Sequence, residues 1–102
     1  MDVAQFAKYV IDNMSRATLA NALNIANKLD VEGGYKVEEF IKALNEYLTH
    51  TDVIQRLGTI KTAKIVVAID DCQKHYFSQT KYQKHMIIDN LIIDIWCAIN
   101  DR

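Results

Sequence analysis

Two cysteines and three histidines are the residues of this sequence that most readily bind metal or act as nucleophiles. Cys72 and His75 lie three positions apart, so on a helix they share one face, but structural zinc needs two further ligands that converge on them. His85 and Cys97 are separated by about 18 Å along a helix, so they cannot both be ligands of the same ion. No third residue can be named to orient a Cys–His nucleophile pair. The sequence therefore predicts neither a metal site nor a catalytic nucleophile.

Paired carboxylates are the other arrangement that could carry out chemistry. Asp89 and Asp94 differ by about 140° around a helix, and the adjacent Asp70 and Asp71 differ by about 100°. Neither pair can face inward together, so we expect these acids at the polar edges of helices. The glycine pair at 33–34 is not followed directly by the Lys-Ser or Lys-Thr that a phosphate-binding loop requires. We therefore expect a protein that is not an enzyme and that binds no cofactor.

Composition limits the class of protein. The chain has 102 residues, of which half are hydrophobic and a quarter charged, which is typical of a single globular domain over 1–102. A net charge of -1 argues against strong, non-specific binding to nucleic acid or to an anionic membrane. Direct nucleic-acid contact should therefore be weak or absent. The most apolar stretch, 86–100, is shorter than the roughly 20 residues that span a bilayer. Two cysteines without a signal-peptide pattern favour reduced thiols and a cytoplasmic location.

The spacing of apolar residues predicts helices throughout. Proline is absent and glycine appears three times, so few residues interrupt a helix. Apolar residues at i, i+3 and i+4 predict helices over 2–14, 16–29, 37–48 and 60–77, with a fifth that reaches the C-terminus. Ser15 and Thr59 are the expected caps of the second and fourth, and Ser78 or Thr80 that of the fifth. A short connection with one or two helical turns should end at Gly58.

The last two predicted helices are apolar on more than one side. The fourth carries one stripe of Ile60, Ala63 and Val67 and a second of Ile65, Ile69, Cys72 and Tyr76. The fifth is apolar over most of its circumference. A helix of this kind packs on several sides. The sequence therefore predicts an all-α fold, a compact bundle of about five helices in which the last two are central.

Three segments carry a resemblance to a known family. The stretch "TAKIVVAIDDCQKHYFSQTKYQKHMIIDNLIIDIW" at 62–96 joins two long helices by a polar turn, with an aliphatic–aliphatic–Asp–Asn–Leu–aliphatic–aliphatic pattern at 87–93. It resembles the end of the C-terminal collar domain of delta-prime-like clamp-loader AAA+ ATPase subunits. "VEEFIKALNEYL" at 37–48 is similar to the preceding collar helix, and 6–30 to the helices before it.

This resemblance implies a non-catalytic oligomerisation domain that acts in DNA replication. Such a domain packs beside sister subunits of a clamp-loader-like assembly or beside copies of itself, while separate modules hydrolyse ATP. We expect the interface among apolar side chains that the core cannot accommodate. These are Ile65, Tyr76, Tyr82, Ile93 and Trp96.

A second hypothesis comes from a different class of protein. A free-standing small helical protein of a phage or mobile element could bind a host protein or a nucleotide. Aromatic and basic residues gather where the last two predicted helices meet, and an aromatic ring beside lysines can stack on a base. The candidate ligand site consists of Tyr76, Lys81, Tyr82 and Lys84.

Overall fold

The computed structural model describes residues 2–29, 35–76 and 81–102, apart from the side chains of 81–83. Its helices, in chain order, are α1 (Val3–Asn13), the short 3₁₀ helix η1 (Met14–Arg16), α2 (Leu19–Leu29), α3 (Val37–Tyr47), α4 (Thr51–Leu57), α5 (Thr59–Tyr76) and α6 (Lys81–Asn100). The described ranges contain no strand. The predicted all-α fold is thus confirmed, with α4 as an additional helix in the segment predicted as a short connection. No helix in this part of the chain is long and apolar enough to cross a membrane.

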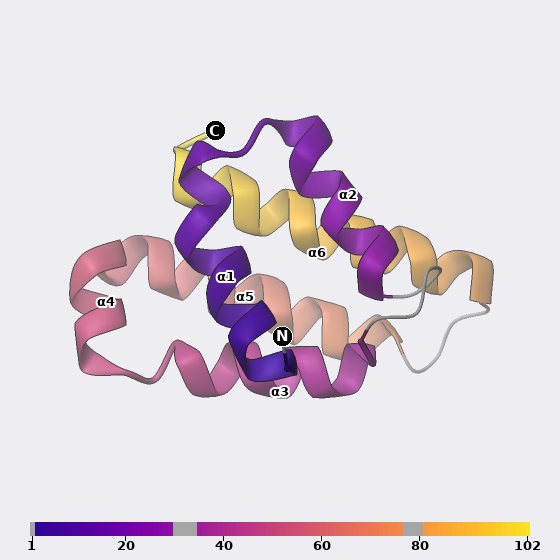
Figure 1. The fold of residues 1–102 in the computed structure, drawn as a ribbon, viewed down its shortest axis with the longest axis horizontal. Helices are drawn as coiled ribbons and strands as arrows, with labels where there is room; N and C mark the ends of the chain where they lie inside the picture. The colour runs from indigo at the N-terminus through magenta and orange to yellow at the C-terminus, as the bar shows by residue number, and fades with distance from the viewer. Residues whose placement is uncertain (1, 30–34, 77–80) are drawn as a thin grey trace.

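Helices α5 and α6 lie at the centre of the arrangement (Figure 1). They pack along each other. Every other helix contacts α5 or α6 directly, or contacts a helix that does. Helix α2 and η1 contact α6, whereas α3 and α4 contact α5. Helix α1 packs on α3 and η1 and completes the bundle. The predicted central position of the last two helices is therefore confirmed.

The first two helices begin at different kinds of cap. Asp2 caps α1, since its Oδ1 accepts a hydrogen bond from the backbone N–H of Gln5 at 2.8 Å, and the Gln5 side chain accepts one from the Asp2 backbone at 3.0 Å. The prediction that Ser15 caps the second helix is wrong, because Ser15 lies within η1. Thr18 takes this role, and its Oγ1 accepts from the N–H of Asn21 at 3.1 Å.

The turn between α4 and α5 depends on Gly58. This residue has φ 91°, a region that side chains with a Cβ rarely adopt. Its N–H donates to the Ile54 carbonyl at 2.8 Å, and its carbonyl accepts from the N–H of Thr62 at 3.0 Å. Gly58 thus ends one helix and precedes the next, and Thr59 is the first residue of α5 rather than its cap. The predicted caps Ser78 and Thr80 lie outside the described residues.

Buried apolar side chains from all the helices form one core cluster. Among its largest fully buried members are Phe40, Ile11, Met14, Leu44, Ile65, Ile69, Ile88, Leu91, Ile92 and Ile95. At the contact between α1 and α3, the ring of Phe6 lies 5.5 Å from that of Phe40, centroid to centroid, and stacks on Tyr35 at 4.3 Å. Aromatic packing therefore joins the N-terminal helix to the rest of the bundle.

Two side chains of α6 bind the backbone around η1. The Nε1 of Trp96 donates to the Ala17 carbonyl at 2.8 Å, and Nδ2 of Asn100 donates to the Met14 carbonyl at 3.1 Å. A helix end or short turn leaves backbone carbonyls with few partners in their own segment, and the Met14 carbonyl otherwise accepts only from the N–H of Ala17 at 3.3 Å among the described residues. These bonds hold the segment between α1 and α2 against the last helix.

A polar network joins α1, α3 and α4. Asp12 Oδ1 accepts hydrogen bonds from the Tyr47 hydroxyl at 2.7 Å and from Arg56 Nη2 at 2.8 Å. Arg56 Nη2 also donates to the Tyr47 oxygen at 2.9 Å. The pKa of Tyr47 is raised, chiefly by burial and then by its hydrogen bond to the Asp12 carboxylate. The neutral phenol is therefore the form that the fold favours.

Stability is expected to fall at alkaline pH because of Tyr47. Since its pKa is higher in the folded than in the unfolded chain, its contribution is fully present below the unfolded value of about 10. The contribution is lost as the pH rises through the folded value. Replacing Tyr47 by Phe should make this alkaline loss shallower. Thermal unfolding of both proteins from neutral to alkaline pH measures the difference, and parallel curves would contradict it. Tyr9→Phe, at an exposed tyrosine of α1, is the matched control.

Candidate functional site

The surface with the most exposed apolar side chains lies on α5. Six large apolar residues in the described part of the chain are well exposed, and three of them, Ile60, Val66 and Val67, belong to this helix. Ile60 is 73% exposed and Val67 60% exposed. They share one side of α5 with Ala63, because positions three, four and seven apart lie together on a helix. We call Ile60, Ala63, Lys64, Val67 and Asp71 the outer face of α5.

The opposite side of α5 belongs to the core. Ile65 is 0% exposed and Tyr76 is 7% exposed. The prediction that the core cannot accommodate these two side chains is therefore wrong. They lie about 160° to 180° around the helix from Val67, where α5 meets the rest of the bundle.

The other three predicted interface residues lie on α6. Ile93 and Trp96 are half-buried. Trp96 packs against the core and donates its N–H to Ala17, so its indole is held within this chain. The side chain of Tyr82 lies outside the described part. The structure thus does not bring the five predicted residues together into one exposed patch.

A hollow of about 410 Å³ runs beside the outer face, between α5 and α6. Small side chains make up much of its lining: Ala63, Ala68, Cys97 and Ala98. Its charged residues are divided between two ends. Lys64 and Arg102 lie toward the start of α5 and the end of α6, whereas Asp71 and Asp94 lie farther along the antiparallel pair. The surface therefore has an apolar middle, a basic end and an acidic end.

The two carboxylates at the acidic end, Asp71 and Asp94, lie close enough to interact. The pKa of Asp94 is raised, first by burial and second by the negative charge of Asp71. Asp70, one residue earlier, is paired with Lys74 at 3.0 Å and is directed to that partner. A cation brought to Asp71 and Asp94 from outside would therefore interact with both carboxylates favourably.

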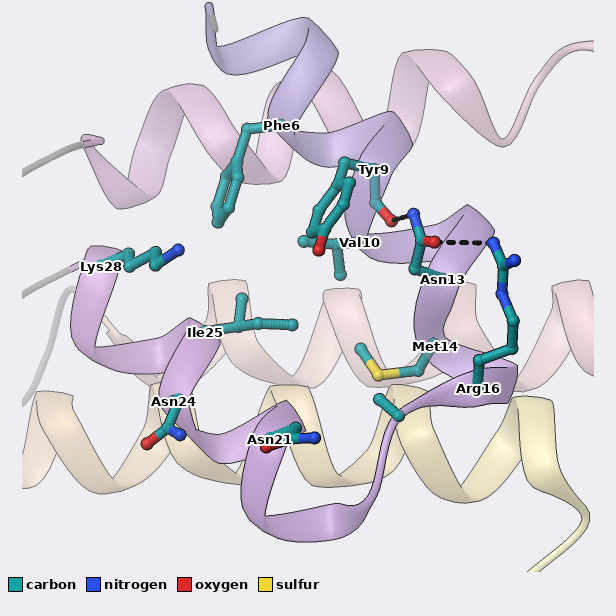
Figure 2. Close-up of a pocket in the computed structure, with 11 residues that line it drawn as sticks. Phe6, Tyr9, Val10, Asn13, Met14, Arg16, Asn21, Asn24, Ile25 and Lys28 are labelled. Carbon is teal, nitrogen blue, oxygen red and sulfur yellow. Dashed lines mark hydrogen bonds between the residues drawn. The ribbon is translucent and has the colours of Figure 1, made fainter.

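A second hollow, of about 420 Å³, separates α1 from α2 (Figure 2). Tyr9, Val10 and Ile25 line its middle, with Arg16 toward one end and Lys28 toward the other. None of the described residues that line it is acidic. This groove could therefore accept an anionic molecule.

The polar groups of this groove are, however, poorly organised for binding. Arg16 already donates to the Asn13 side chain at 2.7 Å. Arg16, Lys28, Asn21 and Asn24 are all exposed. Ligand sites usually direct a few well-placed polar groups into a largely apolar pocket, which these exposed surface groups do not do. The groove is thus a weaker candidate than the outer face of α5.

The predicted ligand site where α5 meets α6 is described only in part. Lys84 Nζ lies 5.0 Å from the centroid of the Tyr76 ring, so the structure does bring these two residues together. The Tyr76 ring is nevertheless largely covered, with 7% of the residue exposed. The side chains of Lys81 and Tyr82 lie outside the described part. A base could not stack on the Tyr76 ring without displacing what covers it.

Cys72 lies in the core, and His75 and His85 each lie beside a group of their own helix. Burial raises the pKa of the Cys72 thiol to about 11, so it is protonated and a poor nucleophile at neutral pH. His75 Nδ1 lies 2.8 Å from the Asp71 carbonyl oxygen of its own helix. His85 lies 3.6 Å from Asp89, one turn along α6. Within the described ranges, no three His, Cys, Asp or Glu side chains are grouped as a metal site requires.

The sequence did contain a signal for the outer face, namely the stripe of Ile60, Ala63 and Val67 opposite a second apolar stripe. That signal predicted a helix packed on both sides, but the structure buries only one of them. Comparisons of the chain with protein-family models, curated proteins and solved structures find no match.

Proposed function

We propose that this chain is a non-catalytic association domain, and that the outer face of α5 contacts a neighbouring subunit. The observation that carries the proposal is the exposure of Ile60 and Val67 on a helix whose other side is already in the core. Burying one such side chain stabilises a complex by roughly 1.5–3 kcal/mol. Exposed apolar patches bordered by charged groups are typical of protein–protein interfaces.

The resemblance to clamp-loader collar domains supports a particular setting for this association. The outer face of α5 lies within the stretch 62–96 and just before it, which is the part of the chain that carries the resemblance most clearly. Collar domains of that family pack side by side and leave ATP hydrolysis to other modules. In this setting the chain works in DNA replication, and its partners are sister subunits of a clamp-loader-like assembly or copies of itself.

Polar substitution of the outer face should weaken association. We expect the Ile60→Ser, Val67→Ser double variant to bind its partner at least about tenfold more weakly, because two exposed apolar contacts are lost. Light scattering measures the mass of the chain alone, 11.7 kDa as a monomer, and of mixtures with the clamp-loader ATPase subunits of the same organism. Met86→Ser is the matched control, since Met86 is a comparably exposed apolar residue on α6.

The result that would overturn the proposal is equally specific. A wild-type chain that stays monomeric at all concentrations and forms no complex with those ATPase subunits has no associating surface of this kind. The same conclusion follows if Met86→Ser weakens association as much as the double variant does, since the loss would then not belong to the outer face.

A further inference from the structure

We infer that the partner on the outer face of α5 is a second copy of this chain, with the two α5 helices packed antiparallel about a two-fold axis near Val67. The inference rests on the proposed association function and names its partner. Most homo-oligomers are closed two-fold dimers in which the same surface patch of both copies meets. Such a patch must be complementary to itself after rotation.

The charges on α5 have this self-complementary pattern. Lys64 lies three residues before Val67 and Asp71 lies four residues after it, on the same side of the helix. They are separated by about 10 Å along the axis and by only about 20° around it. When a second α5 runs in the opposite direction across Val67, Lys64 of each copy faces Asp71 of the other. One rotation therefore forms two ion pairs.

Helix α6 and the residues that follow it repeat the same arrangement beside α5. Arg102 lies on the side of Lys64, and Asp94 lies on the side of Asp71, around the same hollow. The antiparallel packing brings the basic end of one copy to the acidic end of the other. Asp71 and Asp94, which repel each other within one chain, would then receive cations from the second copy.

A parallel packing would have the opposite effect on charge. With both α5 helices in the same direction, the acidic ends meet each other and Asp71 approaches Asp70 of the second copy. Like charges placed together across an interface disfavour that arrangement. The charge pattern thus selects the antiparallel direction.

The apolar residues are suited to close contact about the same axis. Val67 of one copy meets Val67 of the other, and the small side chain of Ala63 leaves room for helices to approach within about 8–10 Å. The contact is limited to one helix face and an adjoining hollow in each copy, which corresponds to the small end of specific interfaces, about 1,200 Å² in total. We therefore expect a reversible rather than an obligate dimer.

Charge exchange tests the pairing directly. Lys64→Glu and Asp71→Lys are each expected to weaken the dimer at least about tenfold, because both symmetry-related pairs become like-charged. An equimolar mixture of the two variants should associate again, since the acidic patch of one then faces the basic patch of the other. Light scattering at matched concentration measures each mass, and circular dichroism checks that both variants are folded. Lys42→Glu, at an exposed lysine of α3, is the control.

The outcomes separate this inference from the proposed function. A mixture of folded variants that fails to associate, although the wild-type chain dimerises, overturns the antiparallel pairing. If the wild-type chain is a monomer that binds the clamp-loader ATPase subunits through Ile60 and Val67, the inference that its partner is a second copy is overturned. The proposed association function is then supported. A wild-type chain that binds neither itself nor those subunits overturns both.

Discussion

Replacing Phe40 by alanine is expected to lower the free energy of unfolding by about 3–5 kcal/mol. Phe40 is 0% exposed, and its ring packs against that of Phe6 where α3 meets α1. The loss includes both the apolar area of the ring and the cavity that remains. Domains of this size have a total stability of about 5–15 kcal/mol, so this loss is a large fraction of the total. Urea denaturation followed by circular dichroism measures the change.

Tyr9→Ala is the control for this prediction. Tyr9 is an aromatic residue of α1 that is 49% exposed, so its removal should change the free energy of unfolding by less than about 1 kcal/mol. If the two substitutions were equally costly, the aromatic packing between α1 and α3 would not be the contact that holds the N-terminal helix.

The second large effect is expected at Ile65. Ile65→Ala should lower the free energy of unfolding by about 2–5 kcal/mol, because this side chain is 0% exposed within α5. Its neighbour Val66 is 44% exposed, and Val66→Ala should be nearly neutral or slightly stabilising. Alanine also favours a helix by a few tenths of a kcal/mol over valine. Denaturation of the two variants under the same conditions gives the comparison.

This pair also tests the orientation on which the proposed surface depends. If Val66→Ala proved more costly than Ile65→Ala, α5 would be rotated relative to the arrangement described. The exposure of Ile60 and Val67, on which the proposed surface rests, would then not hold.

The helices themselves were predictable from local sequence. Periodic apolar residues and the absence of proline determine where α1, α3, α5 and α6 run, because each signal acts within a few residues of itself. The central position of the last two helices was also predictable, since they are apolar on several sides. The positions of the helix ends were less predictable. Thr18 rather than Ser15 caps α2, and the preceding turn is held by Trp96 and Asn100, from far along the chain.

Only part of the candidate site could be predicted from the sequence. Two apolar stripes on one helix predict that both sides are suited to packing, and periodicity alone treats them equally. Which stripe enters the core depends on where α3, α4 and α6 lie against α5, and this is settled only when the whole bundle forms. The bundle buries Ile65 and leaves Ile60 and Val67 in water. The sequence thus determined that α5 has a surplus apolar face, and tertiary packing decided which face it is.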